Sequence, residues 1–497
     1  MGTGWQIFSA LAKGTAKAST ALGRAVGGQV ESAIANRGAF AARSGILGPG
    51  DPSPPPNSGD IYDYRGLISA RQLRNVAGAF PLGYAIEPRR GPVSPIGVPA
   101  EVLEQHAAII GPTGAGKTSS LIVPWIAGAL RDGHSVIAVD VTGNLFDKIR
   151  EYAQNTGPLG ARVAVWDFSH PANSVTWSWL EDLATEDAVV AAVEALIGRD
   201  RPNDPQPYFM QRDRRVLRGL IEGVLATASP SLDTLLTSAS DQSLLRRLAT
   251  LRPAIGNRLA EVAGLPAADF GRAMSGVVNA LDIFGHAGVK AVTRGGGITL
   301  GSLMDAPSLL IIGAPLSGSR TSVSLSSLMI AMLTRELYTR FGQRNARKVF
   351  YFIDEAARLT DRIDFEELLS VSRAAGISVV LAAQNVAQFA DKNERATILD
   401  NCATYVALPS PSDESATYFA SRLGTREVST LTESRTMGGF NAPSSTQYSR
   451  ALSTVPVLGK REIMDPPWGV RSALVHCRPL SGAPFAVDLT RVDLLAP

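Results

Sequence analysis

The sequence predicts an α/β protein with a mainly parallel central sheet and an inserted all-α domain. From about residue 61 onward, short apolar runs alternate with helical patterns, which is typical of a parallel sheet covered by helices. The alternation stops over residues 168–307, where several helix-like blocks occur without a convincing strand. We interpret this stretch as a helical domain inserted into the sequence of the sheet.

The individual elements follow in chain order. Candidate strands are the short apolar runs at 107–110, 135–140, 163–167, 308–313, 348–353, 377–382 and 404–408. Between the third and fourth of these lie helix-like blocks at 185–197, 211–228, 240–251 and 270–284. Residues 429–449 have almost no apolar content, so we expect a long mobile loop there.

Composition divides the chain into further segments. Residues 1–47 are a basic Ala/Gly-rich tail, either an amphipathic helix that touches anionic lipid or a partner, or a solvated tail. Residues 48–60 are a Pro-rich linker, because this stretch cannot hold a helix or a central strand. The sheet domain then occupies 61–180 and 301–497, on either side of an inserted all-α domain at 181–300.

Charge and cysteine content exclude several classes of protein. Lys and Arg number 48 against 45 Asp and Glu among 497 residues, so neither disorder nor a wholly basic nucleic-acid coat fits. Cys402 and Cys477 lie in no CxxC or Cys/His cluster, which excludes a disulfide framework and a cysteine zinc site. With no run of 18 apolar residues, we expect a cytoplasmic protein without a transmembrane helix, or one held peripherally at the inner face of the cell membrane.

A glycine-rich loop carries the strongest functional signal. Residues 111–118, GPTGAGKT, match GxxxxGK[ST] and lie between the β-like AAII and the helix-like SSLIVPWIAGAL. Such a loop curls its backbone N–H groups around phosphates, Lys117 reaches the β- and γ-phosphates, and Thr118 offers a hydroxyl to Mg²⁺. The alternative is an ordinary glycine turn. The predicted nucleotide-binding residues are Gly111, Pro112, Thr113, Gly114, Ala115, Gly116, Lys117, Thr118 and Ser119.

A pair of acids supplies the second half of this site. The hydrophobic run that begins at Val349 ends in Asp354 and Glu355, and the carboxyl ends of parallel strands lie at one edge of the sheet. Asp354 is predicted to hold the Mg²⁺ shell, and Glu355 to polarise the attacking water. The alternative is that these acids only terminate a strand. The pair favours hydrolysis over mere nucleotide binding.

Two further polar residues are candidates for the same chemistry. Gln384 ends the next strand and can contact the γ-phosphate or the catalytic water, unless it is a surface glutamine in a loop. Arg373 precedes that strand, where a guanidinium can complete a neighbouring subunit's site as an arginine finger. The alternative for Arg373 is a solvated or salt-bridged side chain.

These residues resemble the TraG/TraD-type coupling proteins of conjugative type IV secretion, a branch of the FtsK/HerA-like ring ATPases. The resemblance covers about residues 62–490 and rests on His106 with GPTGAGKT, FIDEAARL at 352–359, SRAAGISVVLAAQNVAQF at 372–389 and ILDNCATYVAL at 398–408. It implies a RecA/FtsK-like P-loop NTPase fold, a homo-hexameric ring around a channel, ATP at subunit interfaces, and a helical domain that receives substrate. Asp354, Glu355, Gln384 and Arg373 match the family's functional positions.

The sequence departs from this family in two places. Members usually carry a two-helix membrane anchor, whereas this chain begins with its tail and linker, so a separate membrane-anchor protein is an expected partner. The second strand of the family commonly ends in Asp-Pro-Lys-Gly-acid, but here the sequence is Asp140-Val-Thr-Gly-Asn144. This difference predicts a changed substrate or interface contact.

Two basic clusters are candidates for contact with DNA. The first cluster lies on the helix-like block at 211–228 and consists of Arg212, Arg214, Arg215 and Arg218. These arginines either contact DNA phosphates or form a solvated helix face whose charge Asp213 and Glu222 balance. The other precedes the acidic strand, where loops of a ring motor line a channel: Arg340, Arg344, Arg347 and Lys348.

The function that follows is a P-loop ATPase that uses ATP and Mg²⁺. We expect a coupling-protein translocase that recruits DNA, single-stranded and with its bound relaxase, and moves it to a type IV secretion channel during conjugation. One alternative is a soluble FtsK/HerA-like pump for double-stranded DNA. Another is an ATP-binding adaptor that delivers effector proteins. The expected partners are DNA, a relaxase or effector, channel components and further copies of this chain.

Overall fold

The computed structural model describes most of the chain after residue 79. The described residues are 80–87, 91–199, 207–293, 295, 297–304, 306–314, 319–339, 347–389, 392–409, 411–436, 445–466, 471–480 and 483–489. The predicted tail at 1–47 and linker at 48–60 lie outside them, as do Arg340 and Arg344. The described part forms two compact units: one takes in residues 424–436 and 445–457, and the other takes in the rest.

The larger unit is built on a sheet whose central strands run parallel in the order β9-β3-β8-β7-β4-β6-β5. These strands are β3 (Ala107–Ile110), β4 (Ser135–Asp140), β5 (Arg162–Trp166), β6 (Ser308–Gly313), β7 (Val349–Ile353), β8 (Ile377–Ala383) and β9 (Thr404–Ala407). Except for the edge strand β5, every residue in them is buried, because helices cover both faces. The parallel α/β sheet predicted from the apolar runs is confirmed.

Antiparallel strands extend this sheet beyond β9, in the order β2-β1-β13-β12. They are β1 (Phe80–Glu87), β2 (Gly91–Val98), β12 (Ser472–Cys477) and β13 (Phe485–Asp488). The sequence prediction missed them. Prolines and glycines interrupt β1 and β2, and at Gly83 (φ +112°) the carbonyl oxygen of Asp488 would lie 2.2 Å from any Cβ atom. Only glycine permits that approach of the two strands.

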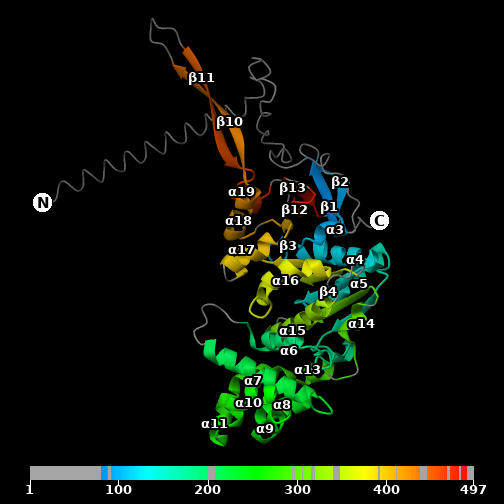
Figure 1. Ribbon diagram of the computed structural model, residues 1–497. Helices are drawn as coiled ribbons and strands as arrows, with labels where there is room; N and C mark the ends of the chain where they lie inside the picture. The colour runs from blue at the N-terminus through cyan, green and yellow to red at the C-terminus, as the bar shows by residue number, and fades with distance from the viewer. Residues whose placement is uncertain are drawn as a thin grey trace, which may run out of the picture. The chain divides into compact units, whose positions relative to one another are not determined.

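Helices cover the two faces of the sheet (Figure 1). Around the sheet lie α3 (Ala100–Leu103), α4 (Val123–Arg131), α5 (Leu145–Thr156), α14 (Leu300–Met304), α15 (Ser319–Tyr338), α16 (Phe365–Val371), α17 (Lys392–Asp400), α18 (Asp413–Leu423) and α19 (Lys460–Met464). Trp125 of α4 is fully buried, and its indole N–H donates to the Pro81 carbonyl of β1 at 2.6 Å. The core therefore extends from the parallel strands to the antiparallel edge.

Between β5 and β6 every regular element in the described part of the chain is helical, and we call α6–α13 the helical insert (Figure 1, green). Its helices are α6 (Glu186–Ile197), α7 (Pro207–Leu225), α8 (Leu232–Ser240), α9 (Gln242–Ala249), α10 (Pro253–Ala263), α11 (Ala267–Ala273), α12 (Ser275–Leu281) and α13 (Ala287–Val292). The Thr185 hydroxyl accepts from the Ala188 N–H and caps α6. Against α6 packs the long helix α15, which joins the insert to the sheet.

The smaller unit is a β-hairpin of β10 (Thr425–Thr436) and β11 (Ser445–Pro456), paired in continuous antiparallel register from Thr425↔Pro456 to Thr436↔Ser445. The prediction of a loop over 429–449 is therefore wrong for 429–436 and 445–449, while 437–444 lie outside the described residues. Apolar content identifies strands that cover a core, whereas a hairpin held by backbone hydrogen bonds needs no apolar face. Across the described residues, no helix is both long and apolar enough to span a bilayer.

Candidate active site

The glycine-rich loop follows β3 and curls back over the carboxyl edge of the sheet. Gly114 and Gly116 have φ of 80° and 94°, the left-handed conformation that glycine adopts without steric cost. The Gly111 N–H donates to the Ala383 carbonyl at 3.1 Å, which ties the loop to the end of β8. Beyond Gly116 the helix begins with a π-helical segment, Lys117–Ile122, that continues as α4. Backbone N–H groups at this helix start form an anion-binding arrangement.

Lys117 lies inside the curve of this loop. Its ammonium donates to the carbonyls of Gly111 at 2.6 Å and Pro112 at 3.3 Å, and the residue is only 7% exposed. Burial lowers the pKa of Lys117, while the carboxylates of Asp354 and Glu355 oppose that shift. The site therefore holds a desolvated positive charge that favours an anionic ligand.

Asp354 lies directly after β7 and meets the loop from the other side. The Thr118 hydroxyl donates to Asp354 Oδ2 at 3.3 Å, although the two residues are far apart in the sequence. Burial and the neighbouring Glu355 carboxylate raise the pKa of Asp354, which Lys117 only partly offsets. A hydroxyl beside a carboxylate whose charge is poorly compensated fits a hard divalent cation such as Mg²⁺.

Glu355 adopts a left-handed backbone conformation (φ 54°), which is unusual for a residue other than glycine. Its Oε1 accepts a 2.8 Å hydrogen bond from Gln384 Nε2, at the end of β8. The structure thus brings Lys117, Asp354, Glu355 and Gln384 to one edge of the sheet. Gln384 orients the Glu355 carboxylate, a contact that sequence reasoning did not anticipate.

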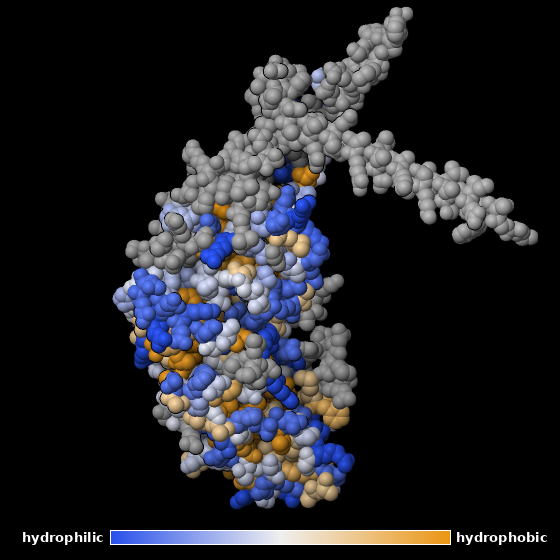
Figure 2. All heavy atoms as spheres, turned by 180° about the vertical axis from the view of Figure 1, so that it is seen from behind, coloured by the Kyte–Doolittle hydropathy of each residue, from blue (hydrophilic) through white to orange (hydrophobic). Residues whose placement is uncertain are grey.

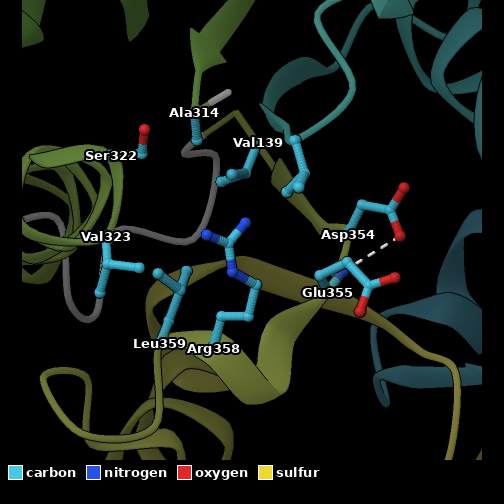
Figure 3. Close-up of a pocket in the computed structure, with 9 residues that line it drawn as sticks. Val139, Ala314, Ser322, Val323, Asp354, Glu355, Arg358 and Leu359 are labelled. Carbon is cyan, nitrogen blue, oxygen red and sulfur yellow. Dashed lines mark hydrogen bonds between the residues drawn. The ribbon is translucent and has the colours of Figure 1, made fainter. Parts of the chain in front are cut away.

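A further arginine was missed by the motif analysis. Arg358 follows Glu355 by three residues, and its guanidinium points into a small pocket between Val139, Ala314 and Val323 (Figure 3). Among the described residues this guanidinium has no ion-pair partner. Arg358 is visible in the sequence as the arginine of FIDEAARL. None of the nucleotide-site motifs discussed above requires an arginine three residues after the second acid, so the sequence alone did not single it out.

Arg373 lies at the opposite edge of the sheet from the other predicted residues. It is exposed on the turn Ser372–Ala375, just before β8, whereas Gln384 comes just after that strand. Seven residues of parallel strand span about 20 Å, so Arg373 cannot reach the glycine-rich loop and acid pair of its own chain.

His106 precedes β3 and is 2% exposed. Its Nε2 donates to the Leu369 carbonyl at 2.9 Å, and its Nδ1 accepts from the Val379 N–H at 3.0 Å. Leu369 and Val379 flank the turn that carries Arg373, so His106 fastens both sides of that turn to the strand that leads into the glycine-rich loop. Sequence reasoning recognised His106 only as part of the family pattern.

The sequence that departs from the family motif has a local role. Asp140 Oδ1 accepts from the N–H groups of Thr142 at 3.0 Å and Gly143 at 2.9 Å, and Oδ2 accepts from Leu145 N–H at 2.8 Å. The buried carboxylate thus closes the turn that begins α5. Asn144 is exposed, as is Thr142.

The arginines of α7 are engaged within the protein. Arg218 pairs with Glu222 at 2.8 Å and with Glu186, and Arg214 Nε donates to the Gly198 carbonyl at 2.7 Å. This arrangement favours the charge-balanced face over a phosphate-binding one. Over the insert, Figure 2 shows hydrophilic side chains beside small hydrophobic patches, a mixture normal for a protein surface. In the second basic cluster, Lys348 pairs with Glu104, and Arg347 donates to the Gly133 carbonyl.

Comparison with known proteins extends these observations. Residues 92–468 match a family model described as "Type IV secretion-system coupling protein DNA-binding domain". The fold is similar to solved structures of the conjugative coupling protein TrwB. An unbound form has a TM-score of 0.63 at 17% identity, covering 85% of this chain and 92% of that one. A complex with the ATP analogue ADPNP has a TM-score of 0.63 at 18% identity, covering 86% and 93%.

A third TrwB structure, in complex with ADP and Mg²⁺, has a TM-score of 0.62 at 17% identity and covers 86% of this chain and 92% of that one. A search of curated proteins found no match.

Proposed function

Because the chain belongs to the type IV secretion-system coupling proteins, we propose that it is an ATP-driven motor that recruits DNA and moves it to a type IV secretion channel. The cargo in this proposal is single-stranded DNA with its bound relaxase, delivered during conjugation. The observation that carries the proposal is the convergence of Lys117, Thr118, Asp354 and Glu355 at one sheet edge. TrwB structures with ADPNP and with ADP and Mg²⁺ support ATP and Mg²⁺ as the ligands of this edge.

Each residue then has a distinct task in hydrolysis. Lys117 and the loop N–H groups bind the phosphates, and Thr118 with Asp354 holds Mg²⁺, which when bound neutralises charge on the β- and γ-phosphates. Glu355 accepts the proton of the attacking water. Gln384 holds the Glu355 carboxylate in place through its 2.8 Å hydrogen bond. The raised pKa of Asp354 is consistent with a carboxylate that a divalent cation stabilises.

Arg373 supports a ring assembly of this motor. It is exposed, its guanidinium makes no hydrogen bond or ion pair to any residue that the structure describes, and it lies at the sheet edge remote from Gln384. A guanidinium placed there can contact a bound nucleotide only in an adjacent copy of the chain. In a homo-hexamer, each Arg373 completes the site of the next subunit.

The test is the ATPase rate of the full chain alone, with single-stranded DNA and with duplex DNA. Stimulation by single strands supports the proposal, whereas stimulation by duplex alone would indicate a double-stranded DNA pump. ATP binding without turnover, or turnover unaffected by either DNA, would indicate an adaptor for protein cargo. Glu355→Gln is the matched control, because it keeps the size and hydrogen bonding of the side chain but lacks the base.

A further inference from the structure

Within the larger unit, the end of α6 in the helical insert lies against residues 361–364, which belong to the part of the chain that forms the sheet and its covering helices. These residues connect the acid pair after β7 to α16, and α16 leads to the turn that carries Arg373. One continuous segment, 354–384, therefore includes Glu355, Arg373 and Gln384. The insert touches this segment midway between Glu355 and Arg373.

The first connection runs from the segment to the insert. Arg362 Nη1 donates to the carbonyls of Ala195 at 2.8 Å and Leu196 at 2.5 Å, both in the last turn of α6. Carbonyls in the last turn of a helix have no partner within the helix, and the negative end of its dipole lies there. The guanidinium of Arg362 donates hydrogen bonds to these carbonyls and places a positive charge at the negative end of the dipole, so Arg362 caps the C-terminus of α6.

The second connection runs from the insert to the segment. Just beyond α6, Arg199 donates its backbone N–H to the Asp361 carbonyl at 3.1 Å and its Nη1 to the Ile363 carbonyl at 3.2 Å. The same guanidinium forms an ion pair with Asp364. Arg199 and Arg362 thus bind in opposite directions across one junction, which resists both sliding and separation.

The ion pair acts on the start of α16. Asp364 is the N-cap of this helix, and its Oδ1 accepts from the Glu367 N–H at 2.8 Å while Oδ2 faces Arg199. Because Asp364 caps the first turn of this short helix, moving Asp364 moves the start of the helix. His106 holds the far end of the helix through the Leu369 carbonyl. A shift of the insert therefore displaces the start of α16, and with it the connection that leads back to Glu355.

We infer that Arg199 and Arg362 are positioning residues for ATP hydrolysis, through which the helical insert sets the placement of the segment carrying Glu355 and Arg373. This inference rests on the proposed ATPase activity. The contacts of both arginines described above join α6 and the chain just beyond it to residues 361–364, so both act on hydrolysis through the segment. Any cargo that binds the insert and moves it changes hydrolysis by this route, because the two arginines join the insert to the catalytic segment.

The experiment compares Arg199→Ala and Arg362→Ala in the full chain with Arg246→Ala. Arg246 is a matched control because its Nε donates to the Ala263 carbonyl at 2.7 Å, at the end of a helix, entirely within the insert. We expect kcat for ATP to fall by about tenfold or more in the two test variants, because small displacements of catalytic groups cost that much. The Kd for a fluorescent non-hydrolysable ATP analogue should change less than twofold in all three.

A double variant separates positioning from general stability. Asp364→Asn keeps an oxygen for the Glu367 N–H but removes the charge that pairs with Arg199. If the contact carries the effect, Arg199→Ala combined with Asp364→Asn lowers kcat no further than Arg199→Ala alone. Additive losses would overturn the inference, as would a parallel loss of nucleotide binding and thermal stability.

Amide hydrogen exchange gives a readout that does not depend on turnover. Exchange across residues 361–375 should be faster in Arg199→Ala and Arg362→Ala, and unchanged in Arg246→Ala. Unchanged exchange and unchanged kcat in the test variants would refute the inference while leaving the ATPase proposal intact. Absence of turnover in the wild type would instead contradict the ATPase proposal, and exchange would still decide whether the two arginines hold this segment.

Discussion

Stability of this fold is expected to depend on His106 remaining neutral. The Val379 N–H donates to Nδ1 of the ring, so that nitrogen must lack a proton, while Nε2 carries the proton that it donates to the Leu369 carbonyl. A second proton on the ring would place an N–H against the Val379 N–H in a site that is 2% exposed. The folded protein therefore disfavours the imidazolium form.

The magnitude follows from the pKa of His106. Burial, with a smaller contribution from Arg373, lowers it from 6.5 to about 4, although the hydrogen bond to Leu369 opposes the shift. Between these values the unfolded chain binds a proton and the folded chain does not, so the free energy of unfolding falls as the pH falls. This contribution is fully present above pH 6.5 and amounts to about 3 kcal/mol.

The assay compares wild type with His106→Asn by urea unfolding between pH 7.5 and pH 4.5. Asparagine tolerates the left-handed backbone of position 106 (φ 62°) and offers both a donor and an acceptor, but it does not titrate. We expect the stability advantage of the wild type to shrink by about 2.5 kcal/mol over this range. His134 and His476, whose pKa values are also lowered by burial, are present in both proteins and cancel. Parallel pH curves for the two proteins would refute the reasoning.

The remaining predictions concern hydrolysis, measured as ATPase rate and as analogue Kd. Lys117→Ala should weaken nucleotide binding as well as turnover, whereas Glu355→Gln should retain ATP and lower kcat by about 100-fold or more. Gln384→Ala should lower kcat by about tenfold at unchanged Kd, because Glu355 loses its orienting hydrogen bond. Arg373→Ala should bind ATP without turnover and recover activity when mixed with Glu355→Gln, since some interfaces then pair both intact residues.

A different result would contradict each of these predictions. Wild-type kcat in Glu355→Gln would remove Glu355 from the chemistry, and a weaker Kd in Gln384→Ala would assign Gln384 to nucleotide binding. For Arg373, mixed oligomers without recovered activity, once subunit exchange is verified, would exclude action across an interface.

The parallel half of the sheet was predictable, and the antiparallel half was not. Strands buried on both faces, such as β4 and β8, read as uninterrupted apolar runs. At the antiparallel edge, β2 contains two prolines and β1 contains Gly83, which has a positive φ. In a sequence, prolines and glycines indicate turns and not strands. The polar hairpin of β10 and β11 was missed for a related reason, since its register comes from pairing between strands and leaves no periodic apolar trace.

The components of the nucleotide site can be predicted from the amino-acid sequence alone. Local spacing identifies a phosphate loop and an acid pair, because the chemistry of each needs neighbouring residues: glycines next to Lys117 and Thr118, and Asp354 next to Glu355.

Packing of the folded chain sets the individual contacts between residues that are distant in the sequence. The sequence already placed Thr118, Asp354 and Gln384 at one edge of the sheet, but the hydrogen bond from Gln384 to Glu355 and the ion pair of Arg199 with Asp364 arise only in the folded chain. Such contacts depend on how the strands and helices pack across hundreds of residues, and no local pattern encodes that packing.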